Sequence, residues 1–176
     1  FLDHPIAWYG LLFALGFMVG YGIIVTLFAR KLTLAGDLKG QNARDVAMRM
    51  TDALCWFVVL GTVVGARLGH VFFYGWDYYQ DHLWDIPKVW EGGLASHGGA
   101  VGVLLAVWVY IRTVGQRYFP SLTFVGMVDI ICIPTAFVGF CIRMGNFFNQ
   151  EIVGVPSDLP WAVLFGHPMD AAAAVP

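Results

Sequence analysis

The stretch IAWYGLLFALGFMVGYGIIVTLF, residues 6–28, decides the fold because it contains no charged side chain. At about 1.5 Å per helical residue, it is long enough to cross the ~30 Å hydrocarbon core of a bilayer. Residues 53–76 and 122–142 form two more long apolar stretches, and residues 94–111 form a shorter one. We therefore expect an all-α, polytopic transmembrane helical bundle with about four spans, built as a single integral membrane domain over residues 1–176.

The composition excludes a water-soluble domain. Of the 176 residues, 59% are hydrophobic and 12% are charged, and the mean hydropathy is +0.69. Such values are typical of a chain whose solvent is the bilayer. The first apolar stretch has no basic leading region and no small-residue cleavage site, so we expect a retained helix rather than a removable signal peptide. The chain begins at Phe1 and ends at Pro176, and we expect it to be part of a longer protein.

The charges of the loops predict how the spans are oriented. Basic residues follow the first and third apolar stretches: Arg30, Lys31, Lys39, Arg44, Arg49, Arg112 and Arg117. The segment between the second and third stretches is mainly acidic: Asp77, Asp81, Asp85 and Glu91, with Lys88 as its one Lys or Arg. Because cytoplasmic loops are enriched in Lys and Arg, we expect the acidic segment and the N-terminus to face outward.

Four ionisable side chains lie within or beside the apolar stretches: Arg67, His97, Asp129 and Arg143. A charge at membrane depth costs at least about 2.5 kcal/mol, so each is a candidate for a functional role. The expected topology places three of them, together with Tyr9, on the outer side of the membrane. Asp129 lies nearer the inner face, and we expect it to have a structural role.

Arg67 and Tyr9 each have a structural interpretation as well as a functional one. Arg67, His70 and Tyr74 share one helical face because they are spaced three and four residues apart. This face is either a structural pairing face or a surface that meets phosphate, and the sequence leaves both open. Tyr9 lies at the outer end of the first span, where it serves either as an interfacial aromatic anchor or as a functional group.

The segment GFCIRMGNFFNQEIVG, residues 139–154, is the most specific signal in the chain. Arg143 offers a planar fork of donors that suits a phosphate, and Asn146 and Asn149 offer amide donors. Glu151 can orient the arginine or accept a hydroxyl group. Such a cationic, hydroxyl-binding pocket at the outer leaflet fits a glycerophospholipid headgroup, and the alternative is an arginine that reaches out of the membrane with polar neighbours.

The segment WEGGLASHGG, residues 90–99, places His97 between two glycine pairs. Glycine allows backbone N–H groups to approach an anion closely, and histidine can accept a proton near neutral pH. The position at the outer entry of the third span favours a functional role. The alternative is a hydrogen-bonded structural histidine.

The motif RMGNFFNQE, residues 143–151, together with Gly154 resembles the signature of the prolipoprotein diacylglyceryl transferase family. The resemblance continues through residues 8–10 (WYG), through residues 67–69 (RLG) as far as the Phe-Tyr pair that precedes Gly75, and through residues 90–99. It covers nearly the whole chain. The resemblance implies an enzyme, a transferase that moves the diacylglyceryl group of phosphatidylglycerol to the thiol of the lipobox cysteine of preprolipoproteins. This thioether formation is the first step of bacterial lipoprotein maturation.

The resemblance also implies the roles of particular residues. The expected catalytic residues are Tyr9, His97 and Arg143. The residues expected to bind the phosphatidylglycerol headgroup are Arg143, Asn146, Glu151, Gly154, Arg67 and Asn149. The family has no metal and no organic cofactor, and the sequence has no CxxC pair or His/Cys cluster that would suggest a metal.

The expected partners and location follow from the same resemblance. They are phosphatidylglycerol, the preprolipoprotein signal peptide with its lipobox cysteine, and the lipid bilayer, without nucleic acid. The expected location is the bacterial plasma (inner) membrane, as a multi-pass protein whose N-terminus and active site face the periplasmic or extracellular side.

The sequence departs from the family in its later part. The family has seven spans, a His-Pro-Ser-Gln motif and a further active-site arginine, none of which occurs in these residues. His167 and Pro168 are followed by Met-Asp and do not match that motif, so this chain alone is not expected to be catalytically complete. Two other functions are alternatives: a lipid carrier or flippase, which would release no product, and a channel or ion transporter, whose polar residues would be spread through the membrane depth.

Overall fold

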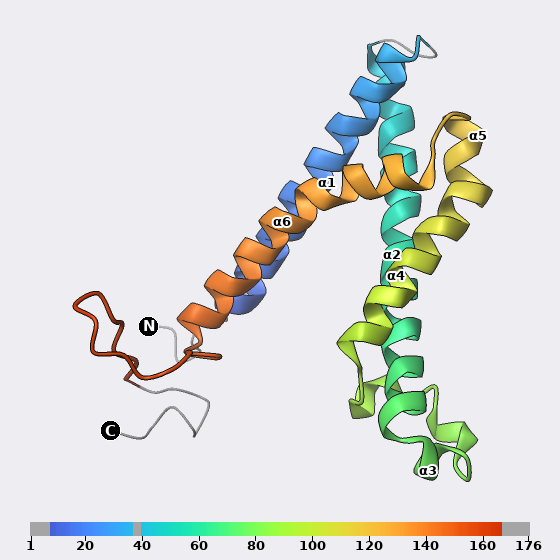
Figure 1. The fold of residues 1–176 in the computed structure, drawn as a ribbon. Coiled ribbons are helices and arrows are strands. Elements are labelled where there is room, and N and C mark those ends of the chain that lie inside the picture. The colour runs from blue at the N-terminus through green and yellow to red at the C-terminus, as the bar shows by residue number, and fades with distance from the viewer. Residues whose placement is uncertain (1–7, 37–39, 167–176) are drawn as a thin grey trace, which may run out of the picture. The chain divides into compact units, whose positions relative to one another are not determined.

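A computed structural model describes residues 8–36 and 40–166 (Figure 1). Within these ranges the chain is helical and contains no β-strand. In the described part of the chain, four helices are long and apolar enough to cross a membrane: α1 (Trp8–Leu34), α2 (Gln41–Tyr74), the helix Ser96–Tyr118, and α6 (Phe124–Phe148). The expected all-α, polytopic membrane fold is confirmed.

The helices extend beyond the apolar stretches of the sequence. Helix α2 begins at Gln41, well before the stretch at residues 53–76. Residues with polar side chains can continue the backbone hydrogen bonds of the helix outside the hydrocarbon. The third crossing helix consists of α4 (Ser96–Tyr110), a π-helical turn η3 (Ile111–Gly115) and α5 (Gln116–Tyr118), which makes it longer than residues 94–111. Residues 6 and 7, and the His167-Pro168 pair, lie outside the described residues.

The segment between α2 and α4 is folded into short helices. It contains α3 (Trp76–Tyr79) and the 3₁₀ turns η1 (Leu83–Asp85) and η2 (Val89–Glu91). We call residues 75–95 the outer segment. Within it, the Asp85 carboxylate lies 2.6 Å from Nζ of Lys88 and accepts a hydrogen bond from the Tyr78 hydroxyl at 2.7 Å. These contacts lower the pKa of the Asp85 carboxyl below its ordinary value.

The chain divides into two compact units. One comprises residues 1–24 and 131–176, and the other comprises residues 25–130. Helix α6 passes from one unit to the other near Pro134, which has no backbone N–H to donate to the carbonyl of Ile130. That the chain forms a single membrane domain stays a prediction.

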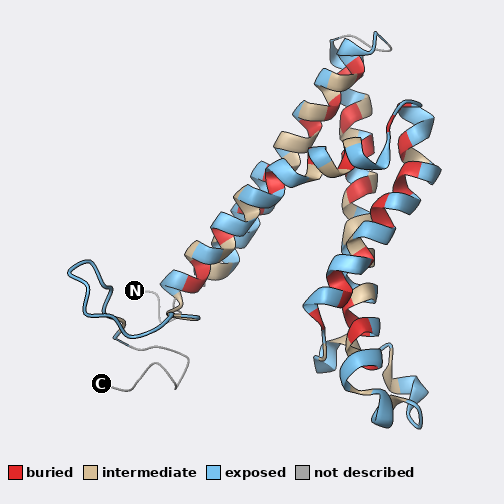
Figure 2. Cartoon of the chain, viewed as in Figure 1, coloured by how far each residue is buried: buried red, intermediate tan, exposed pale blue. Residues whose placement is uncertain are grey.

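In the unit of residues 25–130, α2 and α4 lie side by side (Figures 1 and 2). Glycines of both helices lie at their contact. A Cβ atom on Gly65 would lie 2.5 Å from the carbonyl oxygen of Gly98, and one on Gly69 would lie 2.7 Å from the Cα of Gly98. A Cβ on Gly61 would lie 2.5 Å from the Cβ of Ala106. Glycine therefore allows the two backbones to touch, as is typical of packing between membrane helices.

In the other unit, the first half of α1 packs against the second half of α6. The position of a Cβ on Gly16 is 3.4 Å from the Cβ of Cys141, and that on Gly20 is 3.4 Å from the Cβ of Pro134. These are ordinary van der Waals distances. Small residues on α1 thus allow it to pack against α6. This packing brings the start of α1 near the end of α6.

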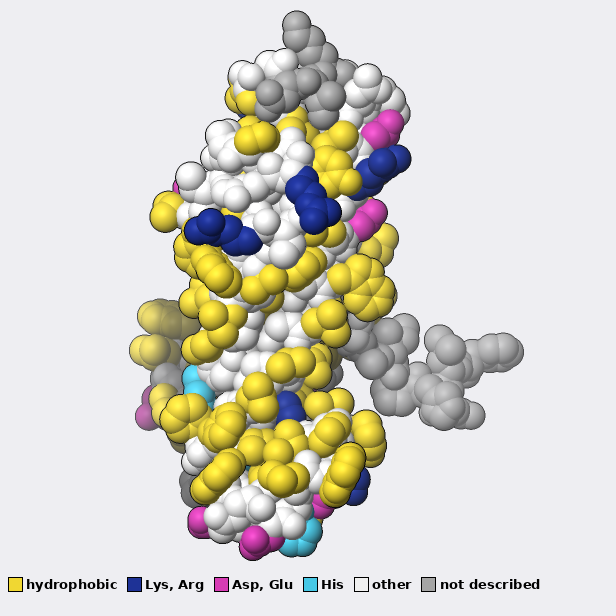
Figure 3. Space-filling view, turned by 90° about the vertical axis from the view of Figure 1, so that its right-hand side faces the viewer, with side chains coloured by type: hydrophobic (Ala, Val, Ile, Leu, Met, Phe, Trp, Pro, Cys, Tyr) yellow, Lys and Arg dark blue, Asp and Glu magenta, His cyan; other side chains and the backbone are white. Residues whose placement is uncertain are grey.

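The surface carries its charges at opposite ends. Figure 3 shows hydrophobic side chains over the middle of a face, with most of its Lys and Arg side chains toward one end, beside some Asp and Glu. Asp, Glu and His side chains gather at the other end, where Lys or Arg is also visible. Many hydrophobic side chains are exposed on the helices, for example Trp56, Leu60 and Leu105, which are 69%, 59% and 60% exposed. Such side chains suit lipid tails or further helices rather than water.

The glycine contact gives a first prediction. Gly65→Ala should lower the free energy of unfolding by about 1–3 kcal/mol, because the new methyl group would overlap the backbone of α4. Thermal unfolding of the purified protein in detergent would measure it. Gly139→Ala in α6 is the matched control, since a Cβ there meets no atom within 4 Å. Equal melting temperatures for the two variants would contradict the backbone contact.

Candidate functional site

The site at the end of α6 is built by the way this helix ends. After Phe148 the chain turns back, so that the N–H of Glu151 donates to the carbonyl oxygen of Asn146 at 2.9 Å. Gln150 and Ile152 have positive φ values of 56° and 53°, which few side chains adopt. This turn satisfies carbonyl groups at the helix end and places Glu151 beside the last turn of α6.

A cavity of about 620 Å³ lies where the chain turns back. Four of the residues predicted to bind the headgroup line it: Arg143, Asn146, Glu151 and Gly154. The rest of its wall comes from Phe147, residues 152, 153 and 155–157, and residues 162–165. This volume is within the usual range of small-molecule pockets, about 300–1,000 Å³.

The polar side chains at the cavity differ in whether they have hydrogen-bond partners. The Nδ2 of Asn149 donates to Oε1 of Glu151 at 3.1 Å, so the carboxylate is held by an amide. The side chain of Arg143 is exposed, and none of the described residues forms a hydrogen bond or ion pair with its guanidinium. Asn146 is 8% exposed. The arginine fork is therefore free to take an anion, with amide and carboxylate groups beside it.

Tyr9 belongs to the same unit as this cavity. A Cβ on Gly145 would lie 2.8 Å from Cδ2 of Tyr9, so glycine lets the tyrosine ring rest directly on α6. The neighbouring Trp8 ring lies 5.5 Å from the Phe148 ring. The structure thus brings Tyr9, from the start of the chain, next to the motif at residues 143–154.

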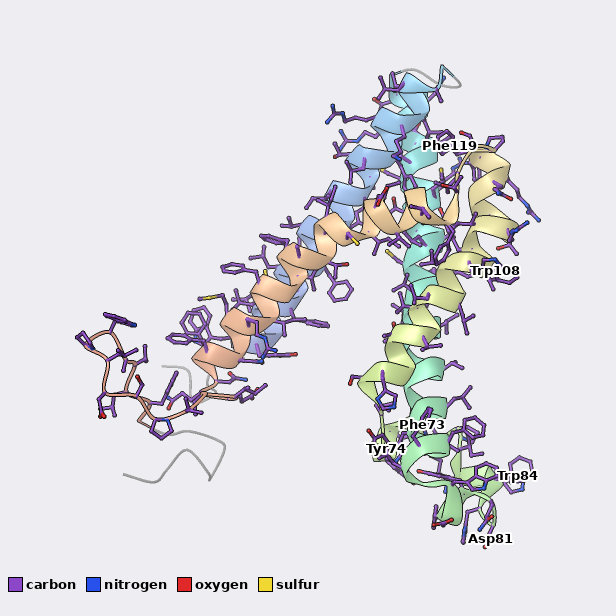
Figure 4. The ribbon with its side chains drawn as sticks, in the orientation of Figure 1. Phe73, Tyr74, Asp81, Trp84, Trp108 and Phe119 are labelled. Atoms are coloured by element: carbon purple, nitrogen blue, oxygen red, sulfur yellow. The ribbon has the colours of Figure 1, made fainter. Side chains whose placement is uncertain are left out.

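His97 belongs to the other unit and lies in the first turn of α4. Its side chain is exposed, and its ring lies 5.3 Å from the Phe73 ring and 5.7 Å from the Tyr74 ring. Figure 4 labels these two aromatic residues near the end of α2. Among the described residues, no group hydrogen-bonds to the imidazole nitrogens.

Arg67 belongs to the same unit as His97 but is buried, with 4% of its surface exposed. Its Nε donates to the carbonyl oxygen of Ile86 at 2.8 Å, and Nη2 donates to that of Asp85 at 2.7 Å. Its Nη1 donates to the carbonyl oxygens of Gly92 at 2.6 Å and Gly93 at 3.3 Å. The guanidinium is thus occupied by backbone groups, and its expected contact with a phosphate stays a prediction.

The remaining candidate, Asp129, lies exposed on α6 in the unit of residues 25–130, and no described residue forms an ion pair with it. Two of these contacts were not predicted from the sequence: that of Asn149 with Glu151 and that of Arg67 with the outer segment. The spacing of Asn149 and Glu151 offered a local signal for the first. The second joins residues 18 to 26 positions apart, and no local pattern reveals it.

Among the described residues, four helices able to cross a membrane, one of which ends at a cavity lined in part by an arginine, define an integral membrane protein. The chain belongs to the prolipoprotein diacylglyceryl transferase family, whose sequence model matches residues 1–176.

Curated relatives bear the name phosphatidylglycerol–prolipoprotein diacylglyceryl transferase. The protein of Protochlamydia amoebophila is 34% identical, in an alignment that covers 100% of this chain and 68% of that protein. That of Tolumonas auensis is 43% identical, over 92% of this chain and 56% of the relative. That of Chlamydia pneumoniae is 37% identical, over 97% and 58%. The chain therefore spans between about half and two thirds of the length of these relatives.

Proposed function

We propose that the full-length protein transfers the diacylglyceryl group of phosphatidylglycerol to the thiol of the lipobox cysteine of preprolipoproteins. The names of the relatives support this reaction, and the cavity at the end of α6 supports it independently. The observation that carries the proposal is the guanidinium of Arg143, which has no partner among the described residues, in a wall that also holds Asn146, Glu151 and Gly154. A phosphate bearing a glycerol needs this combination of charge and amide donors.

The reaction is a displacement at the sn-3 carbon of the lipid glycerol. The cysteine sulfur forms a C–S bond to this carbon, the C–O bond to the phosphate breaks, and glycerol phosphate leaves with the bonding electrons. A free thiol has a pKa near about 8.5 and is mostly protonated at neutral pH, so a base or a positive environment accelerates the attack.

In this scheme each candidate residue has a task. Arg143 binds the phosphate through its fork and stabilises the charge that develops on it as the bond breaks. His97 takes the thiol proton or donates to the headgroup. Asn146 and Glu151 hold the headgroup hydroxyls, and Tyr9 positions the lipid. Asn149 orients Glu151 through the bond described above.

The proposed location is the bacterial plasma membrane, with the N-terminus and the cavity on the outer side. The distribution of charge supports this orientation, because α2 runs from a basic loop to the acidic outer segment. Most Lys and Arg side chains of the face in Figure 3 lie toward one end, which also supports this orientation. Both substrates, a phospholipid and a peptide anchored in the bilayer, are accessible from such a position.

Transfer by the full-length protein tests the function directly. Purified protein would be incubated with phosphatidylglycerol and a lipobox peptide, and with a peptide whose cysteine is replaced by serine. We expect a diacylglyceryl mass gain on the cysteine peptide alone, together with free glycerol phosphate. Lipid binding without any mass gain would instead indicate a carrier.

Arg143→Lys tests the role of the guanidinium. Lysine keeps the positive charge but loses the planar fork, so turnover should fall by about 10²-fold or more. The rate of glycerol phosphate release would measure it. Arg112→Lys is the matched control, because Arg112 is exposed and its contact is with the Trp108 ring, 5.9 Å away. A near-normal rate for Arg143→Lys would remove the two-pronged phosphate contact from the mechanism.

His97→Gln tests the base. If His97 takes the thiol proton, the variant should lose about 10²- to 10⁴-fold in rate at neutral pH. Part of the rate should return as the pH rises toward the pKa of the peptide thiol, because more thiolate then forms without a base. A pH–rate profile of kcat would show this. A small, pH-independent loss would contradict the base and leave His97 as a headgroup donor.

A further inference from the structure

Arg67 joins two parts of the outer segment to α2. The carbonyl groups of Asp85 and Ile86 come from its middle, and those of Gly92 and Gly93 come from just before α4. A guanidinium has five N–H donors in one plane, which lets a single side chain reach carbonyls from two directions. One buried side chain thus ties two separate parts of this segment to the helix.

Further contacts surround this guanidinium. Its Cζ lies 5.1 Å from the centre of the Tyr79 ring, so an aromatic face from the start of the outer segment covers the charge. Gly92 and Gly93 have positive φ values of 90° and 72°, a conformation that glycine adopts readily. A Cβ on Gly93 would lie 2.8 Å from Nη1 of Arg67 and 2.7 Å from the His70 ring. The absence of a side chain at Gly93 therefore leaves room for the guanidinium.

The clamped part of the chain leads directly into α4. The N–H of Ala95 donates to the carbonyl oxygen of Ala66 at 2.9 Å, and Gly98 packs on Gly69. His97 lies between these two backbone contacts, and its ring meets Phe73 and Tyr74 of α2, the aromatic pair labelled in Figure 4. The position of the imidazole thus depends on where residues 92–95 are held.

The alternative task for Arg67, binding a phosphate, would require the guanidinium to leave this arrangement. The carbonyl oxygens of residues 86, 92 and 93 would then lose this donor, and that of Asp85 would keep only the Lys88 N–H. The loss of these part-buried hydrogen bonds is unfavourable. Among the described residues no carboxylate pairs with Arg67, so the carbonyl dipoles balance its buried charge. These contacts favour a side chain that stays where it is.

We propose that Arg67 is a positioning residue, which clamps the outer segment to α2 and so holds the start of α4, with His97, in the place that the reaction needs. The clamp itself is a statement about this chain alone. Its effect on catalysis rests on the proposed function.

Hydrogen exchange of the full-length protein in lipid nanodiscs, without substrate, tests the clamp. Arg67→Lys keeps the charge but cannot reach all four carbonyls, so amides of residues 86–95 should exchange about tenfold faster or more. Arg112→Lys, on the exposed surface, should leave these amides unchanged. Equal exchange in the two variants would overturn the clamp.

A second variant tests the same contact from the other side. Gly93→Ala leaves Arg67 intact but forces a methyl group onto its Nη1, and the same amides should exchange faster. Gly139→Ala is the control, because its position in α6 is open. Unchanged exchange in Gly93→Ala would also count against the clamp.

Steady-state kinetics separate positioning from phosphate binding. For Arg67→Lys we expect kcat to fall at least tenfold while KM for phosphatidylglycerol stays within about twofold, because His97 is displaced but the lipid contacts remain. A raised KM with unchanged hydrogen exchange would overturn the clamp in favour of a phosphate contact. Faster exchange with an unchanged kcat would overturn the proposed effect of the clamp on catalysis. Absence of transfer by the unmodified protein would count against the proposed function alone, since the exchange measurement needs no reaction.

Discussion

The close approach of α2 and α4 is the contact on which the unit of residues 25–130 depends. In a membrane, lipid tails are as apolar as the side chains they meet, so burial of apolar surface gives no strong drive for helices to associate. Van der Waals contact between backbones takes its place, and Gly65 and Gly98 allow it because they have no side chain. Once these helices are in contact, the length and course of the outer segment between them are constrained.

Both groups of candidate residues occur where a membrane helix ends. A helix end leaves backbone carbonyl groups without partners, and near the bilayer these groups need donors from the protein itself. At the end of α6 the chain turns back and supplies its own N–H groups, which places Glu151 over the last turn. In the outer segment that follows α2, Arg67 donates from its side chain to carbonyl groups of residues 85, 86, 92 and 93, which lie in or just after the 3₁₀ turns. Backbone hydrogen bonding thus accompanies an open cavity in one place and a closed arrangement around a buried arginine in the other.

The two arginines show how surroundings decide what a charge can do. Arg143 is exposed in the wall of a cavity and free of partners among the described residues, so it can bind an anion from outside. Arg67 is 4% exposed and donates four hydrogen bonds to the backbone. Both were candidates for phosphate contact from the sequence because both are arginines near the outer side of an apolar stretch. Their hydrogen-bond partners separate them.

The sequence by itself determined the class of fold and the motif at residues 143–154. Uncharged stretches of sufficient length must be helical in a bilayer, and a motif of neighbouring residues keeps its members close whatever the tertiary structure. It did not determine the helix ends, since polar residues continue a helix outside the hydrocarbon, as at Gln41. Nor could it show that Tyr9 rests on Gly145, or that Arg67 holds Gly93, because those contacts join residues distant in the chain. Only the packing of helices brings such residues together, and packing depends on three-dimensional shape that no local pattern records.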